Sequence, residues 1–177
     1  MARPDLTGVL LVGGSSNRFG SPKALAQLDG ETLAQRAWRV LGEACGTRIA
    51  VGKEADGLAL PFPLVDDGTP TRAALAGVVA GLRAATTKVC VVLPVDTPLV
   101  TPELLLELAD ACADVAVPQT GPLPGAYAKS ALPVLERRLA ENRLALRDVL
   151  DELETRQVEL DPALLANVNK AEDLRRL

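Results

Sequence analysis

A glycine- and serine-rich segment near the amino end combines residue types suited to binding an anion. Residues 12–23, VGGSSNRFGSPK, follow the apolar run TGVLLV and hold Arg18 and Lys23 but no carboxylate. Gly13 and Gly14 allow a ligand to approach the backbone amides closely, and consecutive amides can form a nest for phosphate oxygens. Arg18 would grip such oxygens as a fork, and Lys23 would add a mobile point charge. The segment is therefore a candidate phosphate-binding loop.

The glycine spacing in this loop excludes two common phosphate-binding mechanisms. The loop matches neither GxGxxG nor GxxxxGK[ST], so neither the Rossmann dinucleotide mechanism nor the P-loop mechanism applies. Taken alone, a segment rich in glycine and serine is also typical of a polar surface loop. The two cations on either side of Gly20 favour the phosphate interpretation.

Carboxylates follow two other apolar runs. Asp96 comes just after KVCVVL, where a carboxylate could hold hydrated Mg²⁺ together with substrate phosphates. The alternative is a turn or helix cap, because Thr97 and Pro98 follow Asp96. Asp66 and Asp67 come after FPLV, and a solvated turn is the simpler interpretation of that pair. A phosphate loop and a metal-binding Asp96 at corresponding strand ends would together suit nucleotide transfer.

Composition limits the classes of protein to which the chain can belong. With 177 residues, 48% of them hydrophobic, the sequence predicts a single globular domain over 1–177. A net charge of −4 gives no general attraction to nucleic acid or to an anionic membrane. The chain contains no histidine, which excludes imidazole-dependent triads and histidine zinc sites. The chemistry must therefore rest on carboxylates, cations, backbone amides or a bound metal.

The cysteines and the hydropathy pattern indicate a cytoplasmic protein. Cys45, Cys90 and Cys112 form no CxxC pair, and we expect them to be buried small residues in a reducing compartment. The apolar runs are too short to span a bilayer, and the N-terminus lacks a signal-peptide pattern.

Strand and helix patterns alternate along the chain and must position these side chains. We expect strands over 7–12, 47–51, 62–65, 88–93, 114–117 and 156–160, and helices over 31–44, 73–85, 102–113, 130–142 and 145–154. Continuous apolar strands in βαβ order predict a mostly parallel sheet with helices on both faces. Thr32 and Gln35 predict a capping box at the first helix, and Arg137, Arg138, Arg143 and Arg147 are expected on a solvated helix face.

Five segments carry a resemblance to a known family. The stretch LLVGGSSNRFGSPKALAQLDGETL resembles the signature L-x-G-G-x-S-x-R-M-G-x-D-K of the molybdenum cofactor nucleotidyltransferases, most closely the guanylyltransferase branch. ALAGVVAGL is similar to the family's G-P-L-A-G segment, PVDTPLV to its Asp-x-Pro segment, GPLPGAYAKSALPVLERRL to its P-L-x-A-[LV]-Y segment and NVNKAEDL to its late N-x-N segment. The five occur in family order and span nearly the whole chain.

The resemblance implies an α/β fold, a Rossmann-like three-layer α/β/α nucleotidyltransferase domain. It implies transfer of GMP from GTP to the phosphate of molybdopterin with Mg²⁺ and release of pyrophosphate. By position, it assigns nucleotide binding to Leu11, Gly13, Gly14, Ser16, Arg18, Lys23, Asp66, Asp67 and Asp96. It assigns catalysis to Arg18, Lys23 and Asp96, the metal to Asp96, and acceptor binding to Asn167 and Asn169. The implied partners are GTP and molybdopterin, without nucleic acid or membrane, and with transient contact to other molybdenum cofactor proteins or recipient enzymes.

Several positions depart from the family pattern, and two alternatives stay open. Phe19 and Pro22 replace Met and an acidic residue, Ala73 and Ala74 replace Gly-Pro, and Lys170 and Ala171 replace Thr-Pro. One alternative is a cytidylyltransferase or another nucleotidyltransferase with a different acceptor, such as a sugar phosphate. The other is a nucleotide-binding protein without catalysis. The doubled glycine at 13–14 favours guanine, and the retention of Lys23 and Asp96 favours catalysis.

Overall fold

The computed structural model describes residues 1–13 and 19–177, and the predicted loop residues Gly14, Ser16 and Arg18 lie outside that part. The strands are β1 (Arg3–Leu11), β2 (Gln27–Leu28), β3 (Glu31–Thr32), β4 (Cys45–Gly52), β5 (Leu64–Asp66), β6 (Val89–Pro94), β7 (Val115–Pro118), β8 (Gly125–Ala128) and β9 (Thr155–Val158). The α-helices are α1 (Leu33–Ala44), α2 (Ala74–Ala84), α3 (Pro102–Ala111), α4 (Leu132–Ala140), α5 (Leu146–Val149) and α6 (Ala171–Leu174). Short 3₁₀ helices are η1 (Lys23–Leu25), η2 (Glu54–Asp56), η3 (Lys129–Ala131), η4 (Leu150–Glu152) and η5 (Pro162–Leu165).

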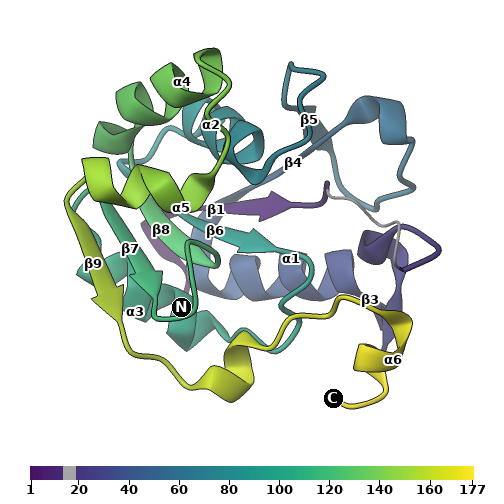
Figure 1. Ribbon diagram of the computed structural model, residues 1–177. Helices are drawn as coiled ribbons and strands as arrows, with labels where there is room; N and C mark the ends of the chain where they lie inside the picture. The colour runs from purple at the N-terminus through teal and green to yellow at the C-terminus, as the bar shows by residue number, and fades with distance from the viewer. Residues whose placement is uncertain (14–18) are drawn as a thin grey trace.

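A mixed, mostly parallel sheet forms the centre of the molecule (Figure 1). Within the described residues, seven strands form this sheet in the order β5-β4-β1-β6-β8-β7-β9. β1 pairs in parallel with β4 on one side and with β6 on the other. From β1 the chain therefore moves outward to β4 and β5, then returns to the other side of β1, and such a reversal creates a crevice at the carboxyl ends of the strands. The predicted three-layer α/β/α architecture is confirmed.

β8 is the strand of the seven-stranded sheet that we did not predict, and the short strands β2 and β3 of the separate hairpin were not predicted either. β8 runs antiparallel to both β6 and β7, and it carries the chain back across the sheet between them. Its sequence, Gly-Ala-Tyr-Ala, has no β-branched residue, although all four residues are buried. Its strand conformation therefore follows from its neighbours in the sheet.

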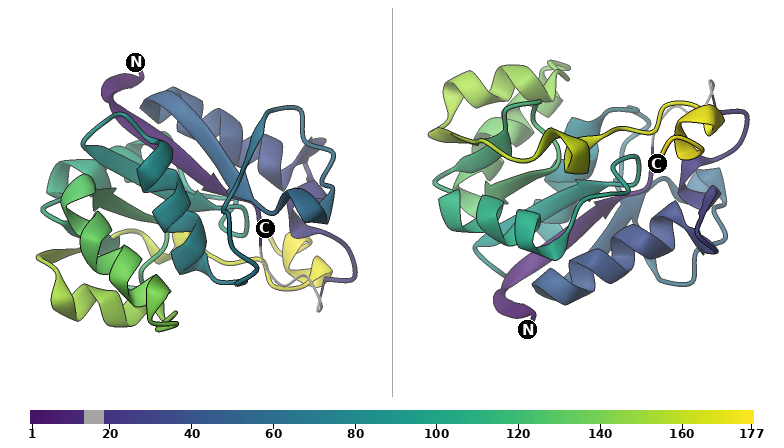
Figure 2. Two further views of the ribbon diagram at one scale, coloured as in Figure 1. Left: turned by 90° about the horizontal axis from the view of Figure 1, so that it is seen from above. Right: turned by 90° about the horizontal axis from the view of Figure 1, so that it is seen from below.

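Helices cover both faces of the sheet (Figure 2). Side chains of β1 alternate between the faces, as strand geometry requires. Leu6 and Leu10 belong to the core cluster that includes α1 and α3, whereas Val9 and Leu11 belong to the cluster that includes α2 and α4. Burying each such side chain contributes about 1.5–3 kcal/mol. β1 therefore anchors both layers and fixes where its carboxyl end lies.

The predicted capping box at the first helix is confirmed. The Gln35 amide donates to Thr32 Oγ1 at 3.1 Å, and the Thr32 amide donates to Gln35 Oε1 at 3.0 Å. Glu31 and Thr32 pair with β2 in a short hairpin, so the helix begins at Leu33 instead of residue 31.

Two glycines let α2 lie directly on β1. A Cβ atom at Gly77 would be 2.7 Å from Leu11 Cδ2, and one at Gly81 would be 2.5 Å from Val9 Cγ1. Both distances are shorter than real carbon contacts, so larger residues would push the helix away. The close packing brings the start of α2 to the carboxyl end of β1.

Burial corrects two details of the sequence interpretation. Cys45 and Cys90 are buried as expected, but Cys112 is half-buried, and all three thiols are free. Arg138 is 3% exposed and forms an ion pair with Glu152, so it does not lie on a solvated face. Among residues 1–13 and 19–177, no helix has the length and apolarity needed to cross a membrane.

Candidate active site

A cavity of about 500 Å³ opens at the carboxyl ends of the central strands. In the sheet register, Leu11 of β1 pairs with Val51 of β4 and with Pro94 of β6, and all three residues line the cavity. The floor of the cavity is therefore a row of neighbouring strand ends. This is the place where open α/β sheets bind ligands.

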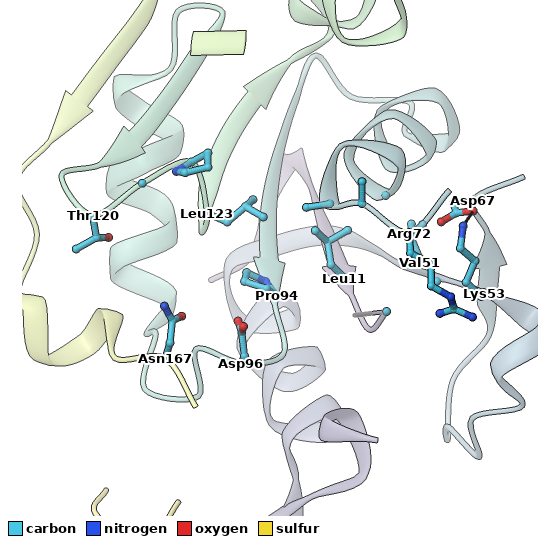
Figure 3. Close-up of a pocket in the computed structure, with 17 residues that line it drawn as sticks. Leu11, Val51, Lys53, Asp67, Arg72, Pro94, Asp96, Thr120, Leu123 and Asn167 are labelled. Atoms are coloured by element: carbon cyan, nitrogen blue, oxygen red, sulfur yellow. Dashed lines mark hydrogen bonds and ion pairs between the residues drawn. The ribbon is translucent and has the colours of Figure 1, made fainter. Parts of the chain in front are cut away.

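Two differently built sides flank this floor, as Figure 3 shows. The β4 side consists of Gly52, Lys53, Asp67, Arg72, Ala73, Ala74 and Gly77. The β8 side consists of Thr120, Gly121, Pro122, Leu123 and Asn167. Asp96 lies between the two sides and turns its carboxylate toward the cavity. The arrangement has room for two ligand groups that meet near one carboxylate.

Asp96 occupies the position expected of a ligand-binding carboxylate. The β1–β6 ladder continues past the strand end, because the Val95 amide donates to the Leu11 carbonyl at 3.2 Å. Thr97 Oγ1 closes the turn on the Pro94 carbonyl at 3.1 Å, and the Thr101 hydroxyl caps α3. Threonines therefore carry out the local turn and cap roles that were the alternative for Asp96.

The electrostatic environment of Asp96 favours a cationic partner. Burial raises the pKa of Asp96, and the positive charge of Lys23 partly offsets this rise. A carboxylate in such surroundings is poorly hydrated, so its ionised form gains more than usual from a nearby cation. Lys23, at the start of η1, is close enough to act on this carboxylate, and the two predicted residues act on one another electrostatically.

The amino end of the predicted phosphate loop also reaches the cavity. The Val12 amide donates to the Val51 carbonyl at 3.1 Å, so the chain leaves β1 alongside β4. Leu11 and Gly13 line the cavity.

The structure separates the predicted pair Asp66 and Asp67. Asp67 lines the cavity, and its amide donates to the Gly52 carbonyl at 3.0 Å. Asp66 is not among the lining residues. Its carboxylate accepts the backbone amides of Glu54 at 2.8 Å and Gly68 at 2.7 Å, and these bonds lower the pKa of Asp66. Asp66 therefore holds a turn, and Asp67 faces the cavity.

Sequence reasoning missed two cations on the β4 side. Lys53 Nζ forms an ion pair with Asp67 Oδ1 at 2.6 Å, and the two side chains are 10% and 7% exposed. Arg72 Nη2 binds Asp56 Oδ1 at 2.7 Å while the residue lines the cavity. Lys53 comes two residues after the strand expected over 47–51, so the strand-end rule that found Asp96 could also have found Lys53.

A buried tyrosine shapes the β8 side. The Tyr127 hydroxyl donates to the Pro122 carbonyl at 2.6 Å, and the ring is fully buried. A Cβ atom on Gly125 would lie 2.7 Å from the same carbonyl oxygen, so a larger residue would displace the turn at 120–123. This turn is thereby fixed against the sheet.

Of the two asparagines predicted to bind an acceptor, Asn167 lines the cavity and Asn169 does not. The Val168 amide donates to the Asp96 carbonyl at 2.7 Å, which brings Asn167 beside Asp96. Asn169 is exposed, and its amide donates to Asp173 Oδ2 at 2.8 Å ahead of α6. The short helix α6 begins two residues later, at Ala171.

The described side chains fit a cation that takes few protein ligands. Among residues 1–13 and 19–177, no group of three or more cysteine, aspartate or glutamate side chains could hold a metal ion. Mg²⁺ is commonly bound through one or two carboxylates, several waters and substrate phosphates. Asp96, a partly buried carboxylate that faces the cavity, suits that mode of binding.

Known proteins share both the sequence pattern and the fold. Residues 8–158 match the MobA-like NTP transferase domain. The chain is 36% identical over 154 residues to a protein of Chloroflexus aggregans named "Probable molybdenum cofactor guanylyltransferase", covering 78% of this chain and 74% of the relative. It is 29% identical over 188 residues to the "Molybdenum cofactor guanylyltransferase" of Desulfosudis oleivorans, covering 97% of this chain and 93% of the relative.

A solved structure agrees with these matches. The molybdopterin-guanine dinucleotide biosynthesis protein A of Archaeoglobus fulgidus superimposes with a TM-score of 0.82 and 27% identity, covering 96% of this chain and 95% of that protein. The sequence match runs from β1 to β9 and includes the cavity floor, Asp96 and most of both sides. The chain therefore belongs to the MobA-like family of nucleotidyltransferases, in which use of a divalent metal is typical.

Proposed function

We propose that the protein transfers GMP from GTP to the terminal phosphate of molybdopterin and releases pyrophosphate. The observation that carries this proposal is the position of Asp96 between two differently built sides of one cavity. Nucleotide transfer needs a donor and an acceptor that meet at a charged centre, and the cavity supplies that layout. The names of the relatives supply the identity of the two substrates.

The β4 side is the proposed nucleotide subsite. It adjoins Gly13 and the start of the predicted phosphate loop, and it offers Asp67 as a hydrogen-bond acceptor for the base or the ribose. Lys23, near Asp96, would stabilise the charge that develops on the phosphates. The role proposed for Arg18, binding of the phosphates, rests on the sequence alone, because Arg18 lies outside the described residues.

Asp96 would hold Mg²⁺ together with phosphate oxygens of the substrate. When bound there, the ion would neutralise charge on the reacting phosphates. The partial burial that raises the pKa of Asp96 also reduces its contact with water, so its interaction with a cation is stronger than at the surface.

The β8 side is the proposed acceptor subsite. Asn167 and the turn at 120–123 would orient the acceptor so that its phosphate points toward Asp96. A phosphate nucleophile is already ionised at neutral pH, so the reaction needs positioning and charge neutralisation and no general base. This agrees with a chain that contains no histidine.

The first test is calorimetric titration of the protein with GTP, CTP and ATP, each with and without Mg²⁺. The proposal predicts Mg²⁺-dependent binding with a preference for GTP, followed by pyrophosphate release when molybdopterin is added. A preference for CTP would favour the cytidylyl alternative. Binding of none of the three would favour a protein without this activity.

We place the reaction in the cytoplasm, where the three free thiols would stay reduced. Transient contact with other molybdenum cofactor proteins, or with enzymes that receive the product, stays a prediction.

A further inference from the structure

Lys53 is a buried lysine whose hydrogen bonds point into the protein. It follows β4 directly, and its ammonium group donates to Asp67 Oδ1 at 2.6 Å, to the Thr71 carbonyl at 2.7 Å and to the Thr69 carbonyl. A lysine ammonium has three N–H donors, and these three acceptors match them. Although Lys53 lines the cavity, its donors thus serve the protein and not a ligand.

The acceptors of Lys53 all belong to one segment, which runs from the end of β5 to the start of α2. The carbonyls of Thr69 and Thr71 point at the same ammonium group as Asp67. Three oxygen atoms that converge on one point repel each other unless a cation lies between them. The path of this segment therefore depends on the charge of Lys53.

Further contacts join this segment to the residues that follow β4. Asp66 accepts the amide of Glu54 at 2.8 Å. Arg72 binds Asp56 through two hydrogen bonds of 2.7 and 3.2 Å. We call these two pieces, residues 53–56 and 66–72, the clasp. The buried contact in the clasp is the Lys53–Asp67 pair, because Arg72 is exposed.

The clasp fixes the orientation of Asp67. Its Oδ1 atom accepts from Lys53 and also from the Thr69 amide at 3.2 Å. The hydrogen bonds of the described residues engage Oδ1, so Oδ2 is the oxygen available to a ligand in the cavity. A carboxylate held in one rotamer accepts an N–H or O–H group without first losing conformational freedom.

We propose that Lys53 is a positioning residue that sets the affinity and base preference of the nucleotide subsite. It holds Asp67 and the 66–72 segment in the form that accepts the nucleotide, and it takes no part in the transfer step. This inference rests on the proposed function, because it requires that a nucleoside triphosphate occupies the β4 side.

The test compares Lys53→Met with Lys88→Met in the full-length protein. Methionine keeps much of the length of lysine without its charge. Lys88 is exposed at the amino end of β6, the end away from the cavity, so Lys88→Met is the matched control. Titration calorimetry with GTP and ATP gives affinity and base preference, and steady-state kinetics gives kcat and KM for both substrates.

We expect Lys53→Met to weaken GTP binding about tenfold or more and to reduce the preference for GTP over ATP. The kcat at saturating GTP should stay within about threefold of wild type, and the KM for the acceptor should not change. Lys88→Met should match wild type in each measurement. If Lys53 only stabilised the fold, Lys53→Met would lower the melting temperature but would not change KM for GTP more than kcat.

The single variant leaves Asp67 buried without its cation, so a second comparison guards against misfolding. Lys53→Met in the Asp67→Asn background removes both charges, and its extra effect on GTP affinity should be smaller than in wild type, because the two residues are coupled. Equal effects in both backgrounds would overturn the inference.

The remaining outcomes separate the inference from the proposed function. Wild-type GTP affinity and base preference in Lys53→Met would overturn the inference and leave the proposed function intact. A loss confined to kcat would also overturn it. If wild type prefers CTP, the proposed function fails, and the same variants titrated with CTP still decide the role of Lys53. If wild type binds no nucleotide, both fail.

Discussion

At the scale of single residues, Asp96 combines a partly buried setting with a proposed role that requires charge. Burial raises the pKa of Asp96, and Lys23 acts in the opposite direction. We expect Asp96→Asn to lower kcat/KM by about 100-fold or more, because an amide cannot replace the negative charge that holds a cation. Circular dichroism should show an unchanged fold. Mg²⁺-dependent turnover that survives the substitution would place the metal elsewhere.

Lys23 is predicted to act mainly on the transition state. Its charge acts on Asp96, and in the proposed reaction negative charge would develop there on the phosphates as the bond to pyrophosphate breaks. Lys23→Ala should therefore reduce kcat by a larger factor than it raises the dissociation constant for GTP. Single-turnover kinetics and calorimetry on the same preparation measure the two factors. Equal losses would mean that Lys23 binds substrate and transition state alike.

At the scale of elements, the packing of α2 on β1 depends on glycine. Ala at position 81 would place its Cβ atom 2.5 Å from Val9 Cγ1, which overpacks the core at a cost of about 1–3 kcal/mol. The helix preference of alanine offsets about 1 kcal/mol. We therefore expect Gly81→Ala to lower the free energy of unfolding by about 1 kcal/mol in urea denaturation.

A control for this prediction lies in the same helix. Ala84 is exposed at the end of α2, so Ala84→Gly measures the helix preference without any packing change. A Gly81→Ala protein that is more stable than wild type would show that α2 can move away from β1.

The sequence predicted most of the elements of this fold, because their apolar patterns are local. The strands at β1, β4 and β6 and the helices at α1 and α2 were each predicted within a few residues. β8 was missed because its four residues include no β-branched side chain, and it becomes a strand only through pairing with β6 and β7. Pairing between distant segments is not visible in a local pattern.

The lining of the cavity was predicted only in part, because some of its residues depend on contacts between distant segments. Strand-end logic pointed to Gly13 and Asp96, and the resemblance added Asp67 and Asn167; all four line the cavity. The sequence could not show which of Asp66 and Asp67 faces the cavity. Neighbouring side chains at a strand end point in opposite directions, and the sequence does not show which direction each one takes. Arg72 was missed because its partner Asp56 lies 16 residues away in the sequence. The strand-end rule could have found Lys53, but not its pairing with Asp67, which lies 14 residues away.

At the scale of the whole molecule, stability and pH are linked in two opposite ways. Hydrogen bonds and ion pairs lower the pKa of Glu31, Asp56 and Asp114. These groups stabilise the fold above their ordinary pKa values, and that contribution is lost as pH falls through the lowered values. The protein should therefore begin to lose stability below about pH 4.

Asp96 contributes to the pH dependence of stability with the opposite sign. Its pKa is raised above the ordinary value of 3.8, so the folded protein binds this proton more tightly than the unfolded chain. Its contribution to stability is full below that value and is lost as pH rises through the raised pKa. We expect Asp96→Asn to melt at a higher temperature than wild type at pH 7 without metal. The difference should disappear near pH 3, and Mg²⁺ should raise only the wild-type melting temperature.

The three free thiols also decide how the protein can be labelled. Burial raises the pKa of Cys45 to about 12 and those of Cys90 and Cys112 to about 11, so few thiolates exist at neutral pH. Maleimide dyes react with the thiolate form, and the native protein should therefore label slowly. A cysteine introduced by Thr120→Cys at the cavity wall would react first, and a fluorophore attached there would convert occupancy of the cavity into an optical signal.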